Sequence, residues 1–153
     1  MALPNIFTRS VADVIIARIN ALTPETQPQW GKMNAGQMLA HCCVTYEMVY
    51  EEGKHAKPSG FAKFLLKVFV KGIVVSEKPY KHNSRTAPQF LVTDAREFAK
   101  EKSRLISYIN QTEQLGIGHF DGKESHSFGA LNKLEWNNMF YKHLDHHLTQ
   151  FGV

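Results

Sequence analysis

Three histidines fall within five residues near the C-terminal end of the chain, at His143, His146 and His147. On a helix that turns about 100° per residue, His143 and His147 lie about 40° apart on one face, and His146 lies about 60° from His143 on the other side. Two imidazoles one turn apart can direct their ring nitrogens at a common point, a spacing that recurs in metal sites. The spacing indicates either half of a metal site or two helical histidines that only hydrogen-bond their neighbours.

The face that carries this pair is otherwise apolar apart from one amide. Four side chains lie within about 80° of His143 on the helical wheel: Trp136, Phe140, Gln150 and Phe151. A metal site here needs a third ligand from another part of the chain.

His41 is the candidate for that third ligand. It lies on an expected helix over residues 34–52, where Met38, Thr45 and Met48 share its face and Gln37 comes one turn earlier. A lone histidine on an apolar face favours a core residue over a ligand. That preference reverses if His41 faces the pair on the last helix.

Five stretches carry the apolar period or the end signals of helices: residues 10–22, 34–52, 59–75, 94–115 and 132–153. The third is short, and Gly116 closes the fourth. This series predicts an all-α, up-and-down four-helix bundle, with a long crossover that carries a short extra helix. We expect residues 1–153 to form one domain.

Three of the expected helices begin with a residue that can cap free backbone N–H groups, followed three positions later by a reciprocal partner. The predicted capping pairs are Asn34 with Gln37, Asp94 with Glu97, and Asn132 with Glu135.

Residues 59–75 combine an apolar face with a basic stripe. Lys63, Lys67 and Lys71 are spaced four apart, so a helix places them together. The opposite face is apolar: Phe61, Phe64, Leu65, Val68 and Phe69. The segment is too short and too charged to span a bilayer. Packing on the domain is favoured over lying on an anionic membrane, so we expect no stable membrane association. The following irregular residues 77–92 are typical of a lid or binding loop.

Composition limits the classes of function. The chain has 153 residues, 43% of them hydrophobic, and starts without the basic and apolar regions of a signal peptide. Cys42 and Cys43 are adjacent, so they point about 100° apart on a helix and are predicted to be reduced, which favours the cytoplasm. The net charge of +4 is dispersed along the chain. No nucleic acid partner is expected, because no recognised motif supports one.

Two stretches together resemble a known family. The sequence WGKMNAGQMLAH, from Trp30 to His41, resembles the second-helix signature of the DinB/YfiT-like superfamily. The pattern His143-x-x-His-His147-x-x-Gln150 resembles its last-helix signature. Residues 128–136, FGALNKLEW, are similar to a less characterised branch of the same group.

This resemblance implies a four-helix bundle that holds a divalent metal through three histidines. The motif positions match His41, His143 and His147, whereas His146 matches a position that is not normally a ligand. Family members with known activity are thiol-dependent transferases or isomerases. The crossover over residues 54–92 departs from the family pattern and would cover or reshape the pocket.

The resemblance and the residues agree on the chemistry. Three imidazoles leave a tetrahedral ion one open position, as in catalytic sites. A thiol that binds there loses its proton readily, and the thiolate is the nucleophile. Zinc, nickel, copper or iron all accept nitrogen ligands. Gln37 and Gln150 are candidates to orient an imidazole, with a helix-surface hydrogen bond as the alternative for each.

Three functional hypotheses follow. The first is a cytoplasmic metal-dependent enzyme, a thiol-dependent transferase or isomerase, that acts on a small electrophile with a low-molecular-weight thiol as cosubstrate. The second is a non-catalytic binding or stress-response module that keeps the fold, with or without metal. The third is a peripheral membrane protein that uses the lysine face of residues 59–75.

Other side chains complete the expected site. Four are candidates to line the pocket: Tyr46, His126, Trp136 and Phe140. Acid–base candidates are Tyr46, Glu47 and His126, and the spacing selects none of them. The expected partners are a small-molecule substrate and a second copy of the chain in a homodimer.

Overall fold

Four long helices form the body of the molecule within residues 2–153, the part of the chain that this computed structural model describes. They are α1 (Arg9–Ala21), α2 (Ala35–Tyr50), α5 (Phe98–Phe120) and α6 (Lys133–Gln150). The shorter elements are α3 (Gly60–Phe69), α4 (Lys71–Val75), the 3₁₀ helix η1 (Pro88–Phe90), β1 (Glu124–Ser125) and β2 (Gly129–Ala130). The mostly helical class predicted from the sequence is confirmed.

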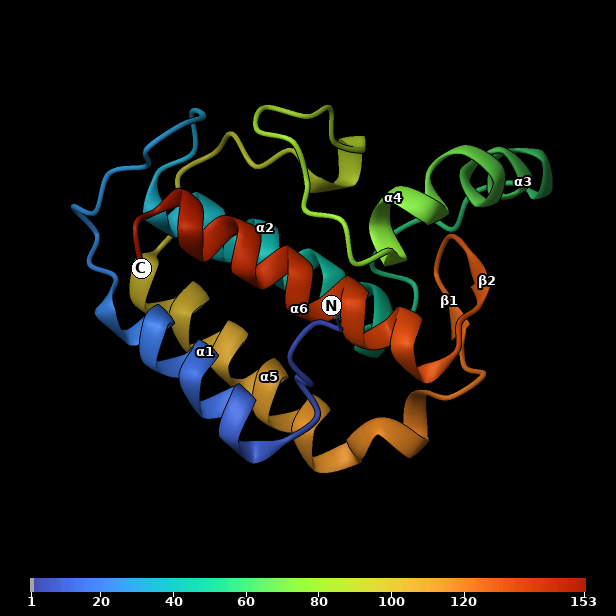
Figure 1. The fold of residues 1–153 in the computed structure, drawn as a ribbon. Coiled ribbons are helices and arrows are strands. Elements are labelled where there is room, and N and C mark those ends of the chain that lie inside the picture. The colour runs from blue at the N-terminus through green and yellow to red at the C-terminus, as the bar shows by residue number, and fades with distance from the viewer. Residues whose placement is uncertain (1) are drawn as a thin grey trace.

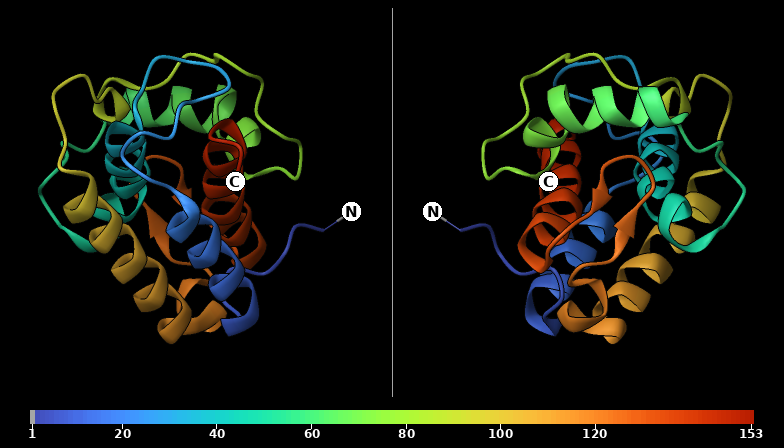
Figure 2. Two further views of the ribbon diagram at one scale, coloured as in Figure 1. Left: turned by 90° about the vertical axis from the view of Figure 1, so that its left-hand side faces the viewer. Right: turned by 90° about the vertical axis from the view of Figure 1, so that its right-hand side faces the viewer.

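The long helices enclose one hydrophobic core. Helix α1 lies beside α5, and α2 lies beside α6, as Figure 1 and the turned views of Figure 2 show. Helix α2 also packs on α5, and α6 contacts α1 and α5. Each long helix contributes fully buried side chains, among them Ile15, Met38, Leu105 and Phe140. This packing fixes the relative position of α2 and α6, the two helices that carry His41, His143 and His147.

Two of the three predicted capping pairs are confirmed. The Asn34 side chain accepts from the backbone N–H of Gln37 at 2.9 Å, and the Gln37 side chain accepts from the N–H of Asn34 at 3.0 Å. Asn132 and Glu135 make the same reciprocal pair at the start of α6. These caps fix where α2 and α6, the two helices that carry the clustered histidines, begin.

The predicted start of the fourth long segment at Asp94 is wrong. Helix α5 begins at Phe98, and Glu97 precedes it without a side-chain cap. The Gln37 side-chain amide donates to the carbonyl of Asp94 at 3.1 Å, and a Cβ atom on Gly36 would lie 2.9 Å from the Arg96 carbonyl oxygen. Residues 94–97 therefore stay outside the helix because they are held against the N-terminal end of α2.

The expected end at Gly116 is a kink rather than a terminus. Gly116 adopts φ +73°, which interrupts the helical geometry, and α5 then continues to Phe120. Only glycine enters this left-handed region at low cost. A short hairpin follows, in which the Ser125 hydroxyl donates to the Gly129 carbonyl at 2.8 Å. The sequence did not predict this hairpin, because two-residue strands carry no periodic signal.

Residues 59–75 form two helices, and the prediction that their apolar face packs on the domain is wrong. Lys63 pairs with Glu124 at 3.3 Å and Lys71 with Glu135 at 2.8 Å, so these two lysines point toward the body. The opposite face of α3 is left exposed, with Phe61 75% and Phe69 69% accessible. The apolar period showed that the helix is amphipathic, but Leu66 and Val70 are the residues that pack against the core. The glutamates that pair with the lysines lie more than 50 residues away in the sequence.

Helix α4 connects α3 to the body. The Lys142 ammonium donates to the carbonyls of Ile73 at 2.7 Å and Ser76 at 2.6 Å, and Asn138 donates to the carbonyl of Val75 at 2.9 Å. Helix α6 thus holds α4 through these hydrogen bonds and also contains two of the three histidines. Within residues 2–153, the helices all fall short of the length and apolarity that crossing a bilayer requires.

Candidate metal centre

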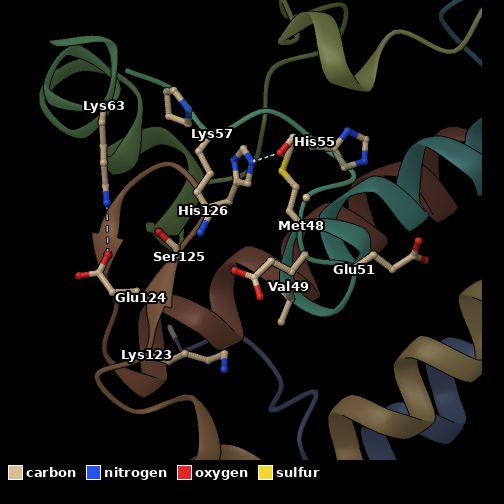
Figure 3. A pocket seen from close by; sticks show the side chains of 13 residues that line it. Met48, Val49, Glu51, His55, Lys57, Lys63, Lys123, Glu124, Ser125 and His126 are labelled. Atoms are coloured by element: carbon tan, nitrogen blue, oxygen red, sulfur yellow. Dashed lines mark hydrogen bonds and ion pairs between the residues drawn. The ribbon is translucent and has the colours of Figure 1, made fainter. Parts of the chain in front are cut away.

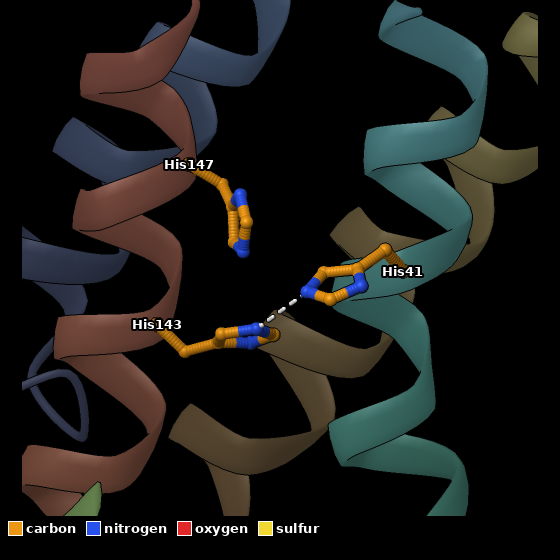
Figure 4. A group of neighbouring side chains, drawn as sticks. All are labelled: His41, His143 and His147. Carbon is orange, nitrogen blue, oxygen red and sulfur yellow. Dashed lines mark hydrogen bonds between the residues drawn. The ribbon is translucent and has the colours of Figure 1, made fainter. Parts of the chain in front are cut away.

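Three imidazoles converge between α2 and α6. His41 comes from α2, and His143 and His147 come from successive turns of α6, with their ring edges turned toward one another (Figure 4). The Nε2 atoms of His41 and His143 are 3.0 Å apart. One ring nitrogen from each of the three residues lies within 4.8 Å of the other two. The i,i+4 pair and the histidine from the second helix therefore meet as expected.

Hydrogen bonds on the outer side of the rings determine which nitrogen faces inward. His41 Nδ1 lies 2.8 Å from the Phe90 carbonyl oxygen. A carbonyl oxygen can only accept, so Nδ1 carries the proton and Nε2 keeps its lone pair. Histidine ligands of metals are commonly held by such a bond from the other ring nitrogen.

The second outer contact involves Gln150. His147 Nδ1 lies 2.8 Å from Gln150 Oε1, and Gln150 Nε2 donates to the Trp30 carbonyl at 2.6 Å. The Trp30 carbonyl requires a donor, so it fixes the amide with Oε1 toward the histidine. His147 Nδ1 must then donate, and its Nε2 is left as the free acceptor.

The third ring is held by a hydroxyl. Thr45 Oγ1 lies 3.1 Å from His143 Nδ1, and Thr45 is one turn after His41 on α2. In this structure His143 Nε2 donates to His41 Nε2, so Thr45 donates to His143 Nδ1. Because a hydroxyl can donate or accept, Thr45 also allows the other tautomer, in which His143 Nε2 is free for an ion. All three rings thus have an Nδ1 partner, which leaves the three Nε2 atoms as the inward-facing set.

Burial keeps these imidazoles neutral. Desolvation lowers the pKa of His41, although the Phe90 carbonyl opposes this, and it lowers the pKa of His147 to about 3. Burial and the neighbouring histidines hold the pKa of His143 well below 6.5. Neutral imidazole is the form that binds metals, because the lone pair is then free.

The three nitrogens fit a divalent ion. Ligand bonds of about 2.0–2.1 Å in a tetrahedral arrangement place neighbouring nitrogens about 3.3 Å apart. The observed separations, from 3.0 Å up to 4.8 Å, bracket that value, so small side-chain movements suffice. The donor set is uncharged and all nitrogen, which suits zinc, nickel, copper or iron and disfavours calcium or magnesium.

The segment between α4 and α5 covers the site. The Phe90 ring in η1 lies 5.4 Å from the His41 ring and 5.9 Å from the His143 ring, measured between centroids. The expectation that the long crossover covers or reshapes this region is confirmed at Phe90. His41 and His147 are buried, and His143 is the partly exposed member of the set.

His146 belongs to different surroundings. Its ring contacts Trp30, Tyr80 and His82, and Trp30 stacks on His82 at 3.7 Å between centroids. These residues line a cavity of about 140 Å³ on the outer side of α6. The structure therefore confirms that His146 points to a different side of α6 from His143 and His147.

Gln37 makes its hydrogen bonds elsewhere. Its amide is used in the capping pair with Asn34 and in the bond to the Asp94 carbonyl. In the described part of the chain, Gln150 is the glutamine that contacts a clustered imidazole.

The aromatic pocket candidates lie in the core. Trp136 and Phe140 pack with Phe120, and Tyr46 stacks between Phe140 and Tyr108 at 5.0 and 5.7 Å between centroids. Burial raises the pKa of the Tyr46 hydroxyl well above 10, and that hydroxyl has no hydrogen-bond partner among residues 2–153.

His126 lines a separate cavity of about 390 Å³ between the end of α2, α3 and the hairpin (Figure 3). Its Nε2 lies 3.2 Å from the His55 carbonyl oxygen. None of the three clustered histidines lines this cavity. Sequence analysis placed His126 near the site without a spacing argument, and the structure does not bring it there.

Glu47 is part of an ion-pair network between α2 and α5. It contacts Arg104, Lys54 at 2.9 Å and His55 at 2.7 Å, and the lowering of its pKa by these partners outweighs the raising by burial. Arg104 also pairs with Glu101 at 2.6 Å. These contacts assign Glu47 to a packing role between helices.

Sequence reasoning missed two groups that hold the rings. The Phe90 carbonyl is a backbone atom, so no residue type could signal it. Thr45 carried a signal, because it lies one turn after His41 on the same face. A helix packed against this face would place an imidazole within hydrogen-bond distance of the Thr45 hydroxyl.

The fold and the site define a mostly helical protein with a three-histidine cluster that can bind a metal. Comparison with protein families matches residues 7–152 to one described as "Protein of unknown function (DUF1569)", and the chain belongs to that family. Searches of curated proteins and of solved structures found no match.

Proposed function

We propose that this protein is a divalent-metal-dependent enzyme of the DinB/YfiT-like type, which uses a low-molecular-weight thiol to attack a small electrophile in the cytoplasm. One observation carries the proposal: three neutral imidazoles meet with their Nε2 atoms inward and each Nδ1 engaged. The two free, buried cysteines are consistent with a reducing compartment.

The three-ligand set leaves room for chemistry. When bound, the ion supplies Lewis acidity at an open position, which lowers the pKa of a thiol that binds there. The protein's part is to keep the imidazoles neutral and correctly turned through Phe90, Thr45 and Gln150. The Phe90 ring also covers one side of the cluster, where it packs near the His41 and His143 rings.

Cobalt substitution tests this proposal. The visible spectrum of the cobalt protein should change when glutathione, bacillithiol or mycothiol is added, because sulfur enters the open position. If the cobalt spectrum stays that of nitrogen ligands alone with all three thiols, thiol chemistry is contradicted. Metal binding would still stand. The His146→Ala variant is the matched control and should respond like the unmodified protein.

A second candidate function is a non-catalytic binding or stress-response module. The cover supplied by Phe90 favours it, since neither the 390 Å³ cavity nor the 140 Å³ cavity is lined by the three histidines. The module would hold metal without exchanging a ligand. Its cobalt spectrum would remain constant when thiols are added, which separates the two functions in the same experiment.

A further inference from the structure

Helix α3 presents an unusually apolar face to solvent. Five side chains that are 38–75% exposed form this face: Phe61, Phe64, Leu65, Val68 and Phe69. On the helical wheel they fall within an arc of about 140°. Ile73 in α4 is also 62% exposed. Scattered exposed apolar residues are normal, whereas a contiguous patch rich in phenylalanine marks a binding surface.

The helix contacts the body along one side only, where Leu66 and Val70 pack against the core. Among the described residues its main packing partner is α4, and α4 in turn packs on α6. Figure 1 shows α3 projecting at the end of the molecule beyond the hairpin. Lys63 ties its inner side to Glu124. Its apolar face is accessible to a large flat surface, and Lys67 is exposed on the stripe that also carries Lys63.

Positive charge is in excess on the segment that carries this face, although Glu52 and Glu124 are also exposed close by. Residues 53–76 contain five lysines and no aspartate or glutamate: Lys54, Lys57, Lys63, Lys67 and Lys71. Lys54, Lys63 and Lys71 pair with glutamates of the body, and Lys57 and Lys67 are exposed. Lys78, Lys81 and Arg85 add exposed positive charge in the segment that follows. A negatively charged partner is the complement of this surface.

A second copy of the chain fits poorly. A two-fold interface places the same patch on both sides, so it would bring two lysine-rich segments together. Helix α3 is only about 15 Å long, so a two-fold contact confined to it would be a small one. An anionic bilayer accepts a helix of this size, because the phenylalanines enter only about 5–10 Å.

We propose that the apolar face of α3 docks on the surface of an anionic lipid bilayer, with the neighbouring lysines at the headgroups. The premise for expecting no membrane association was that this face packs inside the domain, and the structure removes that premise. Attachment of this kind is reversible, because one short helix buries limited apolar area and the attraction to headgroups is screened by salt.

Co-sedimentation with vesicles tests the proposal. The full chain should sediment with vesicles of phosphatidylcholine and phosphatidylglycerol, less with phosphatidylcholine alone, and less as salt rises. The double variant Phe61→Glu, Phe64→Glu should bind more than about tenfold more weakly, because it replaces two apolar rings at the bilayer with charged groups. Lys57→Glu with Lys67→Glu should weaken binding to the anionic vesicles only.

Val14→Glu and Leu134→Glu are the matched controls, because these residues are 60% and 61% exposed but lie on α1 and α6. Both should bind like the unmodified chain, with circular dichroism confirming that every variant folds. Failure to sediment, or equal losses in the controls, would overturn the proposal. Analytical ultracentrifugation tests whether a second copy of the chain occupies the face instead. A dimer that forms in the unmodified chain and is lost in the Phe61→Glu, Phe64→Glu variant, with no vesicle binding, would assign the face to a second copy.

Discussion

Each histidine of the cluster is defined by what its outer nitrogen contacts. The Phe90 carbonyl, the Thr45 hydroxyl and the Gln150 amide hold the three Nδ1 atoms, so the inner atoms are all Nε2. A chance group of core histidines would show no such common orientation. The types and spacing of His41, His143 and His147 were readable in the sequence, whereas two of their three outer partners required the packed structure.

The buried histidines should make the chelator-treated protein sensitive to acid. Because folding lowers the pKa of His147 from 6.5 to about 3, the unfolded state binds more protons between those values. Stability is therefore complete above pH 6.5 and is lost as pH falls toward 3. We expect a loss of about 2 kcal/mol at pH 5 from this residue.

Thermal unfolding of the metal-free protein at pH 7 and pH 5 measures this effect. The melting temperature should fall between the two pH values by clearly more in the unmodified chain than in His147→Gln, which cannot take up the proton. Equal falls in the two proteins would show that His147 does not titrate with the lowered pKa.

At the scale of elements, α2 and α6 supply the three imidazoles and the crossover covers them. Phe90 covers the imidazoles, so Phe90→Ala should speed the loss of metal to a chelator severalfold. The backbone carbonyl that holds His41 remains in this variant, so the metal content at equilibrium should stay the same. Leu91→Ala is the matched control, because Leu91 is its neighbour and 62% exposed.

Release rates are followed with a coloured chelator in stopped flow. A rate for Phe90→Ala equal to that for Leu91→Ala would mean that the crossover does not control access to the cluster.

The elements also show where sequence reasoning reaches its limit. Local signals were sufficient at Asn34 and Asn132, because a cap and its partner lie within one turn of each other. They failed at Asp94, where the competing contact comes from Gln37, and at residues 59–75, where Leu66 and Val70 pack on the core and the lysines pair with Glu124 and Glu135. Long-range partners of this kind leave no periodic trace in the segment itself.

At the scale of the whole molecule, an ion-pair network joins α2 to α5. Arg104 pairs with Glu101 and Glu47, both nearly inaccessible to solvent. Without Arg104, Glu47 keeps its contacts with Lys54 and His55, but buried Glu101 keeps only the longer contact with Arg96 at 3.8 Å. Because Glu101 is left with its weaker partner, Arg104→Ala should lower the free energy of unfolding by about 2 kcal/mol.

Urea denaturation measures that loss, with Arg9→Ala as its control. Arg9 pairs with Asp13 and Glu113 on the surface and should contribute less than about 1 kcal/mol. Similar losses in the two variants would contradict a structural role for the network. Because Arg104 does not contact the imidazoles, metal content in the folded variant should be unchanged.

The metal content of four single variants tests the central claim most directly. His41→Ala, His143→Ala and His147→Ala each remove one Nε2 atom and should each lose most of the bound metal. His146→Ala should keep it, because that ring lies with Trp30 and His82. The measurement is metal per chain by elemental analysis of untagged, folded protein. Metal lost from His146→Ala and kept in His147→Ala, or kept in all four variants, would contradict the three-histidine site.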